Sequence, residues 1–391
     1  MTHLPASAGR ARFDIADIVR QHRAQLESET HLTLAQRRVL SAIALCRTAE
    51  LGGHVDTCRS CGFEHPSYNS CRNRHCPKCQ ALAQEKWIAA RTERLLPVQH
   101  FHVVFTLPNE LRALAHGFPR ELFNALFSAA SETLIELGQS RLSAKLGITM
   151  VLHTWTRDLR FHPHVHALVS AGGLAEGGST WTASPRKYLF PVNVMGTLLR
   201  GKMIAAIREL HAKNTFATFS DFADPRAFDE LISRLARTNW VVYAKRPFGA
   251  LHHVLKYLGR YTHRVAIANS RLVDVSSTAV TFRTKNGKIV TLDPVEFLRR
   301  FMHHVLPDSF HKIRHYGLYA GANKEALSAA RLSLSAATKE QAQVATVSWS
   351  EKLRELTGRD IDRCPRCGGV LERRPLASLR SRAPPGVEVA A

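Results

Sequence analysis

Acidic residues are scarce in this chain relative to basic ones. Its 391 residues include 32 Asp and Glu against 54 Lys and Arg, which gives a formal net charge of +22 at pH 7. An excess of one sign this large repels itself in a compact fold, and polyanions commonly compensate for it. The charge therefore favours nucleic acid as a binding partner over a merely solubilising basic surface.

Long apolar runs are also missing. No window approaches the ~20 consecutive apolar residues that a membrane-spanning helix needs, so we expect no membrane partner. The first residues, MTHLPASAGRARFDIAD, lack the basic segment and apolar stretch of a secretion signal. We therefore expect a cytoplasmic protein. No Gly-x-x-x-x-Gly-Lys-Ser/Thr phosphate loop is found either, so the chain is not expected to hydrolyse nucleotides.

The residue pattern divides the chain into three parts. Residues 1–95 combine helical periodicity with a Cys- and His-rich stretch, and residues 96–330 mix strands and helices without a regular βαβ rhythm. Residues 331–391 are expected to form an extension with a Cys pair and a disordered end. This order predicts an α+β fold, with a central antiparallel sheet flanked by helices and preceded by a helical and zinc-binding module.

Seven of the eight cysteines are clustered, and a reducing cytosol does not favour disulfides. Two Cys-x-x-Cys pairs about fifteen residues apart can close a tetrahedral zinc site with structural rather than catalytic character. The predicted zinc ligands are Cys58, Cys61, Cys76 and Cys79. Cys71 or His75 could replace one of them or bind a second ion. Arg72, Arg74 and Lys78 lie among these ligands, so we expect the module to contact DNA.

The remaining cysteines fit this site less directly. Cys46 ends the apolar run VLSAIALC and is expected to be a small buried side chain. Cys364 and Cys367 form half of a zinc ribbon, but two thiolates cannot complete a site and no cysteine follows them. The missing ligands could come from another subunit or from a histidine, such as His303, His304, His311 or His315.

Residues 161–170, FHPHVHALVS, alternate as a strand does. Their three histidines, His162, His164 and His166, therefore share one face. The other face of this strand is apolar. Three imidazoles gathered on one face favour a divalent metal site over a packed core. The strand expected over residues 100–107 has His102 on its non-core face, and pairing with 161–170 could bring His102 to the same ion. The third ligand is thus open between His162 and His102.

Residues 254–265, VLKYLGRYTHRV, predict a helix with Tyr257 and Tyr261 on one face. A tyrosine pair at this spacing is by itself most often a packing feature. Beside a metal site, however, tyrosines supply the nucleophile of a nuclease that forms a phosphotyrosine. The basic residues of this helix, further candidates for DNA binding, are Lys256, Arg260 and Arg264.

The chain resembles the rolling-circle transposases of the insertion-sequence ninety-one family, members of the His-hydrophobic-His endonuclease superfamily. The resemblance spans about residues 30–372 and includes YNSCRNRHCPKCQ, FHVVFTLPNEL, LRFHPHVHALVSAGGL and VLKYLGRYTHRVAIAN. It implies that His164 and His166 are the metal pair and that Tyr257 and Tyr261 are the catalytic tyrosines. It also implies a palm-like sheet with the histidines on a central strand, after an N-terminal zinc module.

The resemblance further implies a bacterial, nucleoid-associated enzyme that cleaves and rejoins single DNA strands through a 5′-phosphotyrosine. Mg or Mn would be the catalytic ion, and Zn the structural one. The expected partners are single-stranded DNA at the element ends and the target, and a host helicase. A plasmid or phage replication initiator with the same chemistry is the alternative enzyme. A non-enzymatic, zinc-dependent DNA-binding regulator is the alternative from another class.

Overall fold

The computed structural model describes residues 12–378, apart from residues 93, 186–187, 223, 246–265, 285, 336–350, 352–353 and 355–359. The chain divides into two compact units that are each built from segments far apart in the sequence. The first comprises Met1–Ala83, Ile267–Arg299 and Ala342–Ala391. The second comprises Gln84–Ala266 and Arg300–Gln341. The C-terminal extension expected over residues 331–391 is thus divided: its first residues, 331–341, belong to the second unit, and the rest belongs to the same unit as the N-terminal module.

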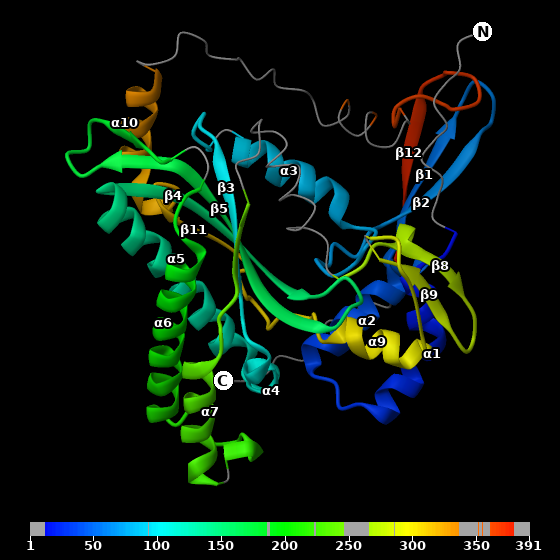
Figure 1. The fold of residues 1–391 in the computed structure, drawn as a ribbon. Coiled ribbons are helices and arrows are strands. Elements are labelled where there is room, and N and C mark those ends of the chain that lie inside the picture. The colour runs from blue at the N-terminus through cyan, green and yellow to red at the C-terminus, as the bar shows by residue number, and fades with distance from the viewer. Residues whose placement is uncertain are drawn as a thin grey trace, which may run out of the picture. The chain divides into compact units, whose positions relative to one another are not determined.

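The second unit is organised around an antiparallel sheet with the strand order β11-β4-β5-β3-β7 and with β6 beside β5 (Figure 1). Its strands are β3 (His100–Thr106), β4 (Ala144–Trp155), β5 (Phe161–Ala175), β6 (Trp181–Ala183), β7 (Val242–Lys245) and β11 (Ile313–Gly317). The long strands β4 and β5 pair with each other near the centre of this sheet. The α+β class and the antiparallel sheet predicted from the sequence are confirmed.

One face of this sheet carries the main apolar core. Alternation along β3 directs Phe101, Val103 and Phe105 into that core, where they meet Phe123 and Phe127 of α5. The helices that contribute to the core are α4 (Arg112–Gly117), α5 (Pro119–Leu142), α6 (Val192–Ala212) and α7 (Pro225–Arg237). Within the described part of the chain, no helix combines the length and apolar character needed to cross a membrane.

The opposite face of the sheet carries a smaller apolar cluster. There Leu168 of β5 packs with residues of α3 (Gln80–Thr92) and α10 (Lys324–Ser335), including Trp87 and Leu327. Side chains two residues apart on a strand point to the same face, so His166 and His164 share the face of Leu168. The predicted metal-binding histidines therefore lie on the face of the sheet opposite α5.

The first unit contains helices and two small antiparallel sheets, β12-β1-β2 and β10-β9-β8. Its helices are α1 (Ile15–Glu29), α2 (Leu34–Leu45) and most of α9 (Pro294–Met302). Its strands are β1 (Gly53–Cys58), β2 (Glu64–Tyr68), β8 (Leu272–Val275), β9 (Val280–Arg283), β10 (Ile289–Leu292) and β12 (Leu371–Leu376). Strand β12 pairs with β1, which explains how residues from both ends of the sequence form one unit.

Candidate metal centre and zinc-binding module

Three histidines converge on the sheet face opposite α5. The antiparallel register of β4 and β5 sets His153 beside His164 and Val151 beside His166. The metal-ligating nitrogens of His153, His164 and His166 all lie within 4.8 Å of one another. His153 and His166 are buried, whereas His164 is partly exposed. Three imidazoles at this separation can bind one divalent cation without a large rearrangement.

Hydrogen bonds orient two of these rings. Nδ1–H of His164 donates to the carbonyl oxygen of His162 over 2.7 Å. Nδ1 of His166 lies 2.7 Å from Nε2 of His102, whose ring stacks on that of His166. Ligating histidines commonly use one ring nitrogen for the metal while the other nitrogen bonds to a neighbouring group that fixes the ring. Both hydrogen bonds occupy Nδ1, so Nε2 of His164 and Nε2 of His166 are the nitrogens that can bind a metal.

Burial keeps the rings of His164 and His102 in the neutral form, which is the form that binds metals. Desolvation lowers the pKa of His164 to about 4. The pKa of His102 is also lowered to about 4, mainly by desolvation and to a smaller extent by the positive charge of Lys245. At neutral pH each ring therefore carries one proton and one nitrogen lone pair. Among the described residues this group consists of histidines alone, without a carboxylate. The donor set thus fits a divalent cation whose remaining positions are taken by phosphate and water.

In the structure, the third imidazole beside His164 and His166 is that of His153. Neither His162 nor His102 belongs to the group of three; His153 takes that place. His162 contributes its backbone carbonyl to His164, and His102 lies behind His166. A signal for His153 was present in the sequence, because two strands joined by the polar turn at Arg157 and Asp158 must pair near His153 and His164.

The described tyrosines differ in their access to this site. Tyr243 of β7 pairs with Val104, which pairs in turn with His166, so Tyr243 occupies the same face two strands away, at ~10 Å. Tyr319 is buried and its hydroxyl bonds to Nε2 of His100 over 2.7 Å. The predicted catalytic and basic residues that lie outside the described part of the chain are Tyr257, Tyr261, Lys256, Arg260 and Arg264.

The clustered cysteines form two groups of four. In the first cysteine group, Cys46, Cys71, Cys76 and Cys79, the sulfur atoms all lie within 4.8 Å of one another. The Cys46 and Cys79 sulfurs are 3.3 Å apart, and those of Cys71 and Cys79 are 3.6 Å apart. Hydrogen bonds from Cys71 and Cys76 lower the pKa of Cys46 to about 7, whereas the Cys46 thiol raises the pKa of Cys76. Four crowded thiols of this kind can all ionise only with a compensating cation.

The second cysteine group consists of Cys58, Cys61, Cys364 and Cys367. The four ligands predicted from spacing are therefore divided, because Cys58 and Cys61 belong to one group and Cys76 and Cys79 to the other. Cys71 joins Cys76 and Cys79 as one of the foreseen substitutes. Cys46 is buried, as expected, and it is also a member of the first cysteine group, which makes it a candidate zinc ligand.

Other residues expected in the zinc module have different surroundings. His75 is buried outside both cysteine groups, and its Nδ1 donates to Oδ1 of Asn73 over 3.1 Å. Nζ of Lys78 forms an ion pair with Asp14 at 2.6 Å and bonds to the carbonyl of Cys46 at 3.2 Å. Lys78 thus links α1 to the first cysteine group. Arg72 is exposed and remains a candidate for phosphate contact, as does the partly exposed Arg74.

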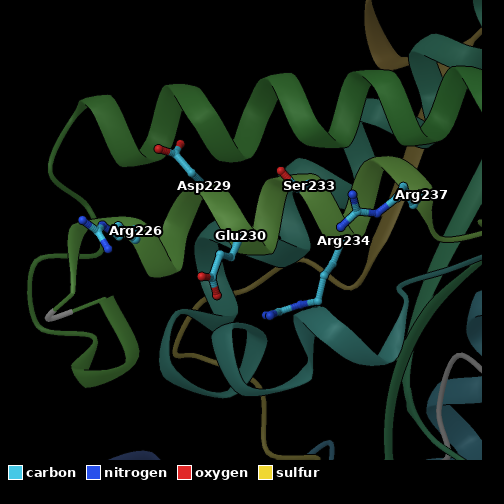
Figure 2. Close-up of a pocket in the computed structure, with 6 residues that line it drawn as sticks. All are labelled: Arg226, Asp229, Glu230, Ser233, Arg234 and Arg237. Carbon is cyan, nitrogen blue, oxygen red and sulfur yellow. The ribbon is translucent and has the colours of Figure 1, made fainter.

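A surface hollow of about 530 Å³ lies along the polar side of α7 (Figure 2). It is lined by Arg226, Asp229, Glu230, Ser233, Arg234 and Arg237. These exposed positions alternate with buried ones such as Phe228 and Leu235, as expected for an amphipathic helix. The hollow contains neither histidine nor tyrosine, so it does not provide an alternative to the histidine site.

Comparison with known proteins defines the class of this chain. Residues 18–107 match a family model described as "Transposase zinc-binding domain", which includes the first cysteine group. Residues 147–326 match a model described as "Putative transposase", which includes His153, His164 and His166. The molecule is thus a transposase with a zinc-binding domain. It belongs to the insertion-sequence ninety-one family of transposases.

Two relatives share most of its length. The "Putative transposase y4qJ" of Sinorhizobium fredii is 41% identical over 373 residues, which cover 92% of this chain and 94% of the relative. The "Transposase for insertion sequence element IS801" of Pseudomonas savastanoi pv. phaseolicola is 30% identical over 305 residues, which cover 76% of this chain and 73% of the relative. No solved structure matches the chain.

Substitution of Cys46 tests whether this residue is a zinc ligand or only a packing residue. We predict that Cys46→Ala lowers the zinc content by about one ion per chain and, because structural zinc contributes strongly to folding, lowers the thermal stability of the module. Zinc content would be measured by elemental analysis and stability by thermal unfolding with and without chelator. A variant that retains the parental zinc content would restore Cys46 to a packing role, and a parent chain without zinc would remove the site altogether.

Proposed function

We propose that this transposase cleaves and rejoins single DNA strands through a 5′-phosphotyrosine intermediate in a rolling-circle reaction. The observation that carries the proposal is the group of His153, His164 and His166 on the sheet. A DNA-binding regulator has no need for three buried or half-buried imidazoles with converging nitrogens. The names of both relatives favour a transposase over a replication initiator with the same chemistry.

In this proposal the tyrosines supply the attacking oxygen atoms and the histidines hold the metal ion. The hydroxyl oxygen of Tyr257 or Tyr261 attacks the scissile phosphorus, the bond from phosphorus to the 3′-oxygen breaks, and the 3′-oxygen takes up a proton as the phenol loses one. The phosphodiester energy is kept in the tyrosine ester, so rejoining needs no nucleotide hydrolysis. Two tyrosines in one chain allow one to hold a strand while the other starts a second transfer.

The histidines would hold Mg or Mn beside the scissile phosphate. When bound, such an ion withdraws charge from a phosphoryl oxygen and so favours attack by an anionic nucleophile. Burial keeps the His164 imidazole neutral, and the chain fixes two of the three rings through the His162 carbonyl and the His102 ring. These contacts orient the ligands before the substrate arrives, which reduces the reorganisation needed during the reaction.

The substrate in this proposal is single-stranded DNA at the element ends and at the target. The net charge of +22 supports such a partner, since phosphate contacts supply most of the sequence-independent affinity. The sequence contains no Gly-x-x-x-x-Gly-Lys-Ser/Thr phosphate loop, because the one stretch with the glycine and lysine spacing, residues 196–202, continues with Met203 and lies within α6, so a host helicase would separate the strands. The place of action would be the bacterial nucleoid.

The first test removes the two motif histidines. We predict that His164→Ala with His166→Ala lowers single-strand cleavage by about 10³-fold or more, because the loss of Lewis-acid assistance costs several kcal/mol at the transition state. DNA affinity should stay within about threefold of the parent, because neutral imidazoles supply no phosphate contacts. Cleavage of a labelled oligonucleotide and filter binding measure the two effects. Parental cleavage by the double variant would contradict the metal assignment.

The second test identifies the third ligand. We predict that His153→Ala weakens Mn²⁺ binding by more than about 100-fold, that His102→Ala weakens it by about 10-fold through the loss of an orienting hydrogen bond, and that His162→Ala changes it little. The dissociation constant for Mn²⁺ would be measured by electron paramagnetic resonance without DNA, so the affinity for the metal is determined separately from activity. Equal affinities for His153→Ala and His162→Ala would exclude His153 as a ligand.

The third test locates the nucleophile. We predict that Tyr257→Phe and Tyr261→Phe each retain some cleavage but lose transposition, and that the double variant forms no covalent adduct, since only the attacking oxygens are removed. Tyr243→Phe is the matched control, because Tyr243 lies on the same sheet face as the histidines and should leave the adduct unchanged. Mass spectrometry of the trapped adduct would reveal the linked residue. A nucleotide on Tyr243, or on Tyr316 of β11, would overturn this assignment.

A further inference from the structure

The second cysteine group joins two parts of the sequence that no family match connects. Cys58 and Cys61 lie within the matched zinc-binding domain, residues 18–107. Cys364 and Cys367 lie beyond both matched ranges, the later of which ends at residue 326. Cys61 and Cys364 are 303 positions apart in the sequence, yet their sulfur atoms are 3.7 Å apart. This group needs an explanation of its own.

The two halves of the group have the same backbone conformation. In the first, the amide of Cys58 bonds to the carbonyl of Phe63 at 2.9 Å, and the amide of Gly62 bonds back to the carbonyl of Cys58 at 2.9 Å. In the second, the amide of Cys364 bonds to Gly369 at 2.8 Å, and that of Gly368 bonds back to Cys364 at 2.9 Å.

The glycines at equivalent positions in these turns both adopt the left-handed conformation, with φ of +67° at Gly62 and +75° at Gly368. Such a conformation is readily adopted only by glycine. Two identical Cys-x-x-Cys-Gly turns that face each other form the two halves of a zinc ribbon.

The sulfur positions fit a tetrahedral metal. Four thiolates at ~2.3 Å from a zinc ion in a tetrahedron lie ~3.8 Å from one another. The separations are 3.5 Å between Cys58 and Cys367 and 3.7 Å between Cys61 and Cys364. A disulfide needs ~2.05 Å between its sulfur atoms. The arrangement is therefore that of a closed four-thiolate site.

The strand that follows the second pair has little else to hold it. Strand β12 pairs with β1 from Gly53 beside Leu376 to Cys58 beside Leu371, but five of its six residues are exposed. The ion pairs across this sheet, Arg59 with Glu372 and Arg373 with Asp56, involve half-exposed or exposed arginines. The Arg59–Glu372 pair, in which both side chains are exposed, contributes little stability, whereas the carboxylate of the Arg373–Asp56 pair is buried. A strand that buries so little apolar surface needs another constraint to stay paired.

We propose that Cys58, Cys61, Cys364 and Cys367 bind a second structural zinc ion, which fastens the C-terminal segment to the N-terminal module. Four thiolates leave no position open for water, so this ion has no catalytic role. Its effect is to hold β12 against β1. The metal replaces the apolar core that this three-stranded sheet lacks.

The proposal is tested by zinc stoichiometry in the full-length chain under reducing conditions. The variant Cys364→Ser with Cys367→Ser should contain one zinc ion fewer than the parent. The matched control, Cys71→Ser with Cys76→Ser, should lose one ion from the first cysteine group, and the combined variant should lose two. Zinc at the histidine site would be common to all four proteins and cancels in these differences. A Cys364/Cys367 double variant with the parental zinc content would overturn the proposal.

Hydrogen exchange measures the fastening itself. In the Cys364/Cys367 double variant, amides of residues 371–376 should lose protection while those of β3, residues 100–106, keep it. Unchanged protection of β12 would overturn the fastening role. A measurement on the unsubstituted chain avoids dependence on variants: when metal-stripped protein is saturated with cobalt, the sulfur-to-cobalt absorption should have the intensity of two four-thiolate sites, because cobalt at the histidines adds no such absorption. The intensity of a single four-thiolate site would contradict the second site.

Discussion

The pairing of β4 with β5 is the constraint on which the site depends. It sets His153 beside His164, and the two-residue period of β5 adds His166 on the same face. A shift of the register by one residue would turn the histidines of one strand into the apolar core. The same alternation directs Val165 and Ala167 to the α5 side, so core packing and ligand placement are fixed by one set of contacts.

The two units are stabilised in different ways. In the sheet unit, a large apolar core stabilises the fold, and buried imidazoles can be held in orientations set by the His162 carbonyl and the His102 ring. In the other unit, the strands β2 and β12 have mostly exposed residues, so the sheet β12-β1-β2 buries little apolar surface of its own, and the proposed zinc sites would supply that constraint. A small module with little apolar surface is the setting in which structural metals contribute folding free energy directly.

Local patterns predicted the elements better than the contacts between them. Strict alternation identified β3 and the histidine strand, and the spacing of histidines correctly indicated a shared face. Spacing could not reveal that Cys46 joins Cys71, Cys76 and Cys79, because Cys46 lies in an apolar stretch of sequence, where a cysteine is expected to be a packing residue. It also could not bring Cys364 to Cys61, since that contact depends on β12 pairing with β1 across most of the sequence. His153 was accessible through the hairpin register, but only if the pairing was followed residue by residue.

The central claim is that the sheet presents three histidines to one divalent cation. Crystals of the chain soaked in Mn²⁺ and measured at the manganese absorption edge would test it most directly, because anomalous scattering locates the ion without any substitution. We expect a single strong peak bonded to ring nitrogens of His153, His164 and His166. A peak bonded to other residues, or no peak beside these histidines at saturating Mn²⁺, would contradict it.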